Sequence, residues 1–316
     1  MAALTETAAK LPPSPTPPRG RRRGRRPVSR HGWRITPWLF LLLPLAFLLV
    51  FTYVPVFNMV GYSFTSWDGL DVQMPFVGLD NYVKIFTTPE LFRVFLVSLY
   101  YLAGAVVQMG LALYFATILS FNTRFRNFFK GIIFFPYLIN GVAIGLVFLF
   151  FFRPGGTLDA VLAAVGFHHP PQWLGDPSIA NWSLAATSVW RYMGLNFVLF
   201  LGAIQSIPGE LYEAADLDGA NSWQKFRFII APGIRQIIGL TFILSVAGSL
   251  SVFELPYVMT GGANGTTTFV IQTINTAFTF QKVGLASAMA VVLLVIVLVV
   301  SWIQRRVFPD QKGDLV

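Results

Sequence analysis

Acidic side chains are scarce in this sequence, and one short segment gathers four of them. Glu210, Glu213, Asp216 and Asp218 belong to the stretch ELYEAADLDGANSWQKFRFIIAPGI, which long apolar runs flank on both sides. We call residues 207–235 the polar connection. An amphipathic loop resting on anionic lipid headgroups would carry more basic than acidic residues. The acidic cluster therefore favours binding to a protein partner over binding to a membrane surface.

Two further ionisable side chains lie inside apolar runs, where a charge is costly. Arg191 and Glu254 each stand alone in a segment that is otherwise uncharged. Such groups usually face a cavity or a partner in membrane proteins. If the two runs are antiparallel helices, both residues fall in the same half, so we predict that they lie close together. Two roles stay open, an ion pair that holds two helices together and a pair of groups that faces a substrate.

The composition indicates that lipid surrounds the elements that carry these residues. The chain has 316 residues, of which 55% are hydrophobic and only 12% are charged. A water-soluble domain usually carries about 25% charged residues. We therefore predict an all-α polytopic membrane protein. Cysteine is absent, and His168 and His169 have no acidic partner at ligand spacing, so we predict no metal site.

Six apolar segments are long enough to cross a bilayer, since about 20 residues at 1.5 Å per residue span the hydrocarbon core. Their approximate ranges are 38–60, 95–120, 131–152, 182–206, 236–258 and 285–303. Together they predict one transmembrane domain over residues 37–308. The intervening external loops are rich in Gly, Pro, Trp and Asn.

Lys and Arg residues are distributed unevenly, which predicts the orientation. With both termini in the cytoplasm, the inner side holds all but five of the 23 Lys and Arg residues, as the positive-inside rule requires. The exceptions are Lys84, Arg93, Arg153, Arg191 and Lys282. The polar connection is then cytoplasmic, as are a disordered Pro/Arg-rich tail (1–36) and a C-terminal tail (309–316). We interpret the arginine cluster of the first tail as a cytoplasmic retention signal rather than a nucleic-acid site.

The first half of the polar connection has the pattern of a short helix. Pro208 suits its first turn, and Leu211, Ala214 and Ala215 share one face at helical spacing. The small alanines permit close approach by another surface. Gly219 then interrupts the helix and allows a turn.

The second half has the pattern of another short helix. Ser222 can cap its N-terminus, and Trp223, Phe226 and Ile230 form an apolar face. Pro232 is expected to end this helix before the next membrane segment. We therefore predict a helix–turn–helix at the cytoplasmic surface.

The polar connection resembles the EAA loop of ABC importer permeases. That loop reads Glu-Ala-Ala, three residues, Gly, nine residues, and then Ile-x-Leu-Pro. The matching positions are Glu213, Ala214, Ala215, Gly219, Ile229 and Pro232. Ala231 stands where the family usually has leucine, which weakens one packing contact and leaves the spacing intact.

Other stretches are similar to the carbohydrate-importer branch of that family. They are FVGLDNYVKIF, WLGDPSIANWS, VWRYMGLNFVLFLGAIQSIP and FELPYVMTGGANGTTT. The resemblance covers about residues 33–308. Ala263 stands where the family often has the proline of a Gly-Gly-Pro sequence, and this change falls in a predicted external loop.

The resemblance implies the type I ABC importer permease fold in a bacterial cytoplasmic membrane. Two permease subunits, as a heterodimer, would form one pathway, and an extracytoplasmic binding protein would deliver the sugar. Two cytoplasmic ATPase subunits would each grip one coupling helix, which here is Pro208 to Ala220. The sequence has no GxxxxGK motif followed by Ser or Thr, so ATP and Mg²⁺ would bind to the ATPase and not to this chain.

Sugar recognition needs hydrogen-bonding side chains beside flat aromatic or apolar surfaces. Candidates for the substrate pathway are Asn140, Arg191, Tyr192, Asn196, Ser249, Ser251 and Glu254. Each of them could instead serve as a helix–helix contact.

Two other classes of function were weighed against an importer subunit. A stand-alone ion-coupled transporter would need a buried relay of acidic or histidine residues, and only Glu254 qualifies. An integral-membrane enzyme would need clustered His and Asp or a Ser/Lys pair at one membrane face, and the sequence shows neither. We therefore predict a transport subunit that is not itself an enzyme.

Overall fold

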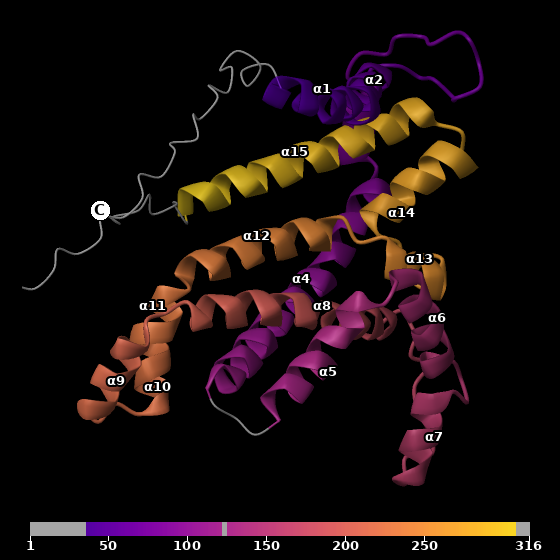
Figure 1. Cartoon of the computed structure of the whole chain (residues 1–316). Helices are drawn as coiled ribbons and strands as arrows, with labels where there is room; N and C mark the ends of the chain where they lie inside the picture. Colours follow the sequence, from indigo (N-terminus) through magenta and orange to yellow (C-terminus); the bar gives the residue numbers. More distant parts are fainter. Residues whose placement is uncertain (1–35, 122–124, 308–316) are drawn as a thin grey trace, which may run out of the picture. The chain divides into compact units, whose positions relative to one another are not determined.

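The computed structural model describes residues 36–121 and 125–307, and these residues are organised as helices (Figure 1). Five helices are long and apolar enough to cross a membrane, or six if one sharply bent pair is counted as a single span. The predicted tails, 1–36 and 309–316, lie outside the described residues except for Thr36, which begins α1. The chain divides into two compact units between residues 54 and 55.

The first unit contributes α1 (Thr36–Leu48) and the π-helical turn η1 (Leu49–Tyr53). Pro44 lies inside α1 and has no backbone N–H, so one hydrogen bond of this helix is missing. With α2 (Val54–Tyr62), this stretch forms the apolar span Phe40–Tyr62. Its side chains are exposed or half-buried and none is fully buried, as expected for a lipid-facing helix.

The second unit is built around α4 (Pro89–Ser120), α8 (Ala180–Gln205) and α12 (Arg235–Leu250). Small residues on α4 let α8 approach closely, since Ala112 and Ala116 are fully buried in one cluster with Phe197 and Phe200 of α8. Helix α4 begins six residues earlier than the predicted segment 95–120, because Pro89 occupies its first turn, where a missing N–H costs little.

The predicted single helix 131–152 is wrong in form. The chain makes α5 (Arg126–Leu138) and α6 (Gly141–Phe152), whose axes differ by 97°. We call residues 139–140 the elbow. Pro136 removes one backbone donor near the end of α5, and the Asn140 side chain accepts a hydrogen bond from the Val142 amide to begin α6.

The predicted helix 236–258 is also interrupted. Helix α12 ends at Leu250, residues 251–253 are irregular, and α13 (Glu254–Thr260) follows in a new helix. Helix α14 (Phe269–Ile274), the π-helical turn η3 (Asn275–Thr279) and α15 (Val283–Val307) complete the unit. Helices α12 and α13 still form one candidate span, Arg235–Thr260, and Glu254 lies at the start of its second helix.

The two longest predicted external loops contain short helices. Helix α3 (Asp80–Thr87) is tied to the preceding loop by Asn81, whose side-chain amide donates to the carbonyls of Ser63 and Thr65. Helix α7 (Thr157–Ala164) carries Asp159, which accepts a hydrogen bond from the Trp173 indole. These contacts fix the loops to the helices that they connect.

Candidate functional site

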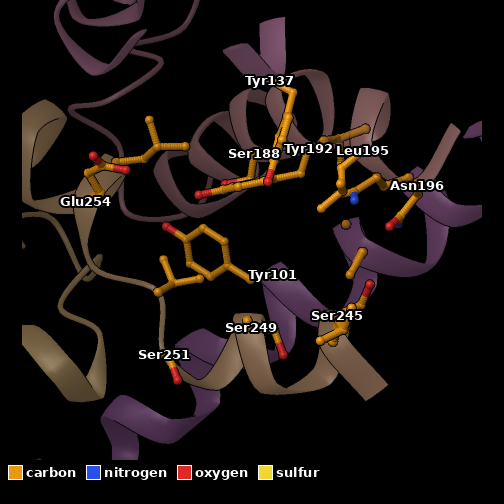
Figure 2. Close-up of a pocket in the computed structure, with 18 of the residues that line it drawn as sticks. Tyr101, Tyr137, Ser188, Tyr192, Leu195, Asn196, Ser245, Ser249, Ser251 and Glu254 are labelled. Atoms are coloured by element: carbon orange, nitrogen blue, oxygen red, sulfur yellow. The ribbon is translucent and has the colours of Figure 1, made fainter. Parts of the chain in front are cut away.

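A cavity of about 440 Å³ lies among α4, α5, α8, α12 and the start of α13. We call it the central pocket. Its polar lining residues are Tyr101, Gln108, Tyr137, Ser188, Tyr192, Asn196, Ser245, Ser249, Ser251 and Glu254. Figure 2 places Glu254 toward one end of this view and Asn196 toward the other, with Tyr101 between them.

Two buried polar groups of the central pocket lack a hydrogen-bond partner within the described residues. They are the Tyr101 hydroxyl on α4 and the Asn196 side-chain nitrogen on α8. A buried polar group without a partner costs about 1–3 kcal/mol. Both residues line the central pocket, and the two atoms themselves are shielded from solvent.

Helix α8 turns one face toward the central pocket. Ser188, Tyr192 and Asn196 recur every four residues and line it together. The Tyr192 ring lies 6.4 Å from the Tyr137 ring of α5, centroid to centroid. The wall therefore combines aromatic faces with hydrogen-bonding groups, which is the combination that sugar rings require.

An ion pair borders the central pocket, and the prediction that Arg191 and Glu254 lie together is confirmed. Arg191 Nη1 on α8 donates to Glu254 Oε2 on α13 at 2.6 Å. The guanidinium also lies 4.9 Å from the centroid of the Tyr192 ring. Glu254 lines the pocket and Arg191 does not.

The other predicted pathway residues divide between the central pocket and the elbow. Tyr192, Asn196, Ser249, Ser251 and Glu254 line the pocket. Asn140 lies at the elbow, where its side chain caps α6.

Sequence reasoning missed the contribution of α4 and α5. Tyr101 and Gln108 lie two turns apart on α4 and share a face, and Tyr137 joins them from α5. The available signal was the seven-residue spacing of two polar side chains in an apolar run.

The polar connection contains α9 (Gly209–Leu217) and α10 (Ser222–Lys225), as the predicted helix–turn–helix requires. Gly219 has φ +74°, a conformation that favours glycine, and it makes the turn after α9. The predicted cap at Ser222 is wrong, because Asn221 is the capping residue. The Asn221 side-chain oxygen accepts a hydrogen bond from the backbone N–H of Gln224. The Gln224 side-chain oxygen accepts one from the backbone N–H of Asn221.

The second helix of the polar connection continues past the predicted stop. Helix α10 runs through the π-helical turn η2 (Phe226–Ile230) into α11 (Ala231–Gly233), so Pro232 lies within a helical turn and not at its end. The interruption falls at Ile234, directly before α12. Ile230 and Ile234 are buried in the cluster with α4 and α8 and anchor the connection.

The outer side of α9 is open. Glu213 and Ala214 are exposed, Leu211 is 50% exposed and Leu217 is 90% exposed. Tyr212 faces inward against the Phe121 ring, and burial raises the pKa of its hydroxyl above the ordinary value. Helix α9 is therefore fixed on one side and presents apolar and acidic groups on the other.

Comparisons with known proteins point to one family. Residues 108–313 match the family described as "Binding-protein-dependent transport system inner membrane component". The chain is 36% identical to the probable ABC transporter permease protein YurN of Bacillus subtilis, over 89% of this chain and 98% of that protein. It is 32% identical to the multiple sugar-binding transport system permease protein MsmF of Streptococcus mutans, over 85% and 93%.

The fold is similar to a solved bacterial ABC transporter that is involved in the import of the acidic polysaccharide alginate. The TM-score is 0.74 at 23% identity, with 88% of this chain and 96% of that chain covered.

Proposed function

The chain belongs to the family of binding-protein-dependent transport system inner membrane components, and we propose that it is one permease subunit of an ATP-driven sugar importer. It forms half of the translocation pathway beside a second, different permease subunit. Two cytoplasmic ATPase subunits supply the energy, and an extracytoplasmic binding protein delivers the sugar. MsmF, by its name, serves multiple-sugar transport, which supports the substrate class.

The open side of α9 is the observation that carries this proposal. Leu211 and Leu217 are exposed in a segment that lies between two candidate spans and not within one. Exposed apolar groups rimmed by polar ones mark a protein-binding surface. Glu213, Ala214 and Ala215 lie on α9, and Gly219 directly after it, so α9 presents the EAA sequence to the ATPase.

The sugar passes through the central pocket in this proposal. Its volume of about 440 Å³ falls in the range of small-molecule sites, which is about 300–1,000 Å³. The hydrogen-bonding side chains of its lining would bind sugar hydroxyls, while Tyr192 offers an aromatic face.

The membrane topology is part of the proposal. Six spans result when α5 and α6 together count as one crossing. Both termini and the polar connection then face the cytoplasm, in agreement with the distribution of Lys and Arg.

The first experiment is mass spectrometry of the proteins that co-purify with the tagged chain from its native membrane in mild detergent. The proposal expects a second permease and a soluble ATPase. A chain that purifies alone, stable and monodisperse, would overturn it in favour of an ion-coupled transporter.

Coupling is tested by Glu213→Lys in the complete complex. Charge reversal should abolish sugar uptake while ATP hydrolysis persists, because the docking surface of α9 is altered and the fold is not. Glu90→Lys is the matched control, since it reverses a carboxylate on α4 that is also exposed. Equal uptake by the two variants would contradict the coupling role.

A further inference from the structure

The ion pair between Arg191 and Glu254 rests directly on the backbone of Gly141. A Cβ atom built at Gly141 would overlap both the carboxylate of Glu254 and the guanidinium of Arg191. Gly141 is the first residue of α6, directly after the elbow. The pair therefore crosses the elbow at a point where only glycine leaves room for it.

Two other glycines allow close packing of α5 against α8 and of α6 against α13. A Cβ at Gly145 would lie 2.8 Å from a methyl carbon of Val258 on α13. A Cβ at Gly194 of α8 would lie 2.9 Å from the Phe134 Cα on α5. Small residues allow helices to pack at close range in a membrane. Helix α5 is thus held to α8, helix α6 is held to α13, and the ion pair joins α8 to α13.

The Arg191 guanidinium of this ion pair does not use all of its hydrogen-bond donors. Arg191 Nε is buried and has no hydrogen-bond partner within the described residues, and the pair is joined through a single Nη1–Oε2 bond. The Arg191 side chain is 12% exposed and that of Glu254 is 38% exposed. Arg191 therefore acts on the central pocket through Glu254, which lines it.

We propose that the Arg191–Glu254 pair is a clamp that sets the elbow angle and aims the Glu254 carboxylate at the central pocket. Arg191 is a positioning residue, and Glu254 determines specificity by accepting a hydrogen bond from the substrate. The second statement rests on the proposed transport function, whereas the first concerns only the geometry of this chain.

The elbow is tested without any substrate. The sequence contains no cysteine, so spin labels can be attached at Ile132→Cys on α5 and Val147→Cys on α6, both exposed positions. Gly141→Ala, which pushes the pair apart, should shift or broaden the label distance in the full complex. Gly131→Ala on α5 is the matched control, since a Cβ there meets nothing within 4 Å. A distance unchanged by Gly141→Ala would overturn the clamp.

The contribution of the two charges is tested by exchanging the residues at positions 191 and 254 in the same spin-labelled complex. Arg191→Glu and Glu254→Arg alone should each reduce sugar-stimulated ATP hydrolysis at least tenfold and broaden the label distance. The double exchange should restore the label distance to that of the parent, while sugar-stimulated hydrolysis should stay low, because an arginine at position 254 cannot accept a hydrogen bond from the substrate. A double variant whose label distance is no closer to the parent than that of the single variants would overturn the clamp.

Transport kinetics distinguish a role of Arg191 in positioning Glu254 from a role in supporting the fold alone. Arg191→Gln should raise the apparent KM for the sugar about tenfold more than it lowers the maximal rate, and Arg191→Lys should recover most of the KM. A fall in maximal rate with constant KM would overturn the positioning role. A parent complex that no sugar stimulates would contradict the proposed function, and the label distances would still decide the clamp.

Discussion

The ion pair at the elbow and the ion pair in the polar connection join the same kinds of charge in different surroundings. Arg191 and Glu254 lie 63 residues apart in the sequence and meet between two helices. Lys225 and Asp216 lie nine residues apart on the polar connection, where the Lys225 side chain is 16% exposed and that of Asp216 is 65% exposed, so the two pairs differ chiefly in the exposure of the carboxylate.

The difference shows that surroundings decide what an ion pair contributes. Water and salt screen an exposed pair, so its contribution is about 0–1 kcal/mol. Removing one partner of a buried pair leaves a charge without compensation and costs roughly 3–5 kcal/mol. The elbow should therefore be sensitive to single substitutions that the polar connection tolerates.

The largest effect is expected for Glu254→Gln, which leaves the buried Arg191 guanidinium without an opposite charge. The free energy of unfolding should fall by roughly 3 kcal/mol, at the low end for a buried pair because Glu254 is partly exposed. Denaturant titration of the purified complex in mild detergent measures this. The double variant Glu254→Gln/Arg191→Met should recover most of the lost stability. If Glu254→Gln alone is as stable as the parent, this ion pair contributes no more than a surface pair.

Gly194→Ala should be the next most severe change. Its new methyl group would meet the α5 backbone near Ile133 and Phe134, and overpacking costs about 1–3 kcal/mol. Gly202→Ala on the same helix is the control, since nothing lies within 4 Å of its Cβ. Equal denaturation midpoints for the two variants would show that α5 and α8 are not held at this contact.

In the polar connection, Asn221→Ala should cost about 1 kcal/mol, because it removes the cap of α10. Faster hydrogen exchange at the Gln224 amide would report the loss locally. Asn221→Asp keeps an accepting oxygen and should retain protection. If alanine protects that amide as well as aspartate does, the capping box is without effect on stability.

The smallest effect is expected for Lys225→Met, which removes the exposed pair and keeps the apolar stem. We expect a change below about 0.5 kcal/mol in unfolding free energy, and added salt should reduce this change further because it screens the exposed pair. A loss comparable to that of Glu254→Gln would remove the contrast between the two regions.

Several elements of the fold could be predicted from the sequence because their signal is local. The apolar runs around α4, α8 and α15 are long, and Gly219 makes the expected turn between α9 and α10. The elbow could not be predicted in this way. Residues 131–152 are apolar apart from Asn140, and hydropathy alone does not record the 97° bend.

The site was predicted only in part for a similar reason. Tyr192 and Asn196 stand out as polar residues in an apolar run, and both line the central pocket. Tyr101 and Gln108 carry the same signal on α4, but which face of α4 meets α8 is settled by packing. The cap at Asn221 was missed because Asn and Ser are both good caps, and the side-chain geometry chooses between them.

The missing side chain at Gly141 also limits how this chain can change over generations. A methyl group there collides with both charged partners, so both side chains have to move or be replaced before it can be accepted. The order in which substitutions accumulate at these positions is therefore constrained. Descendants that keep Arg191 and Glu254 should have inherited Gly141 with them, as one unit of three residues scattered along the sequence.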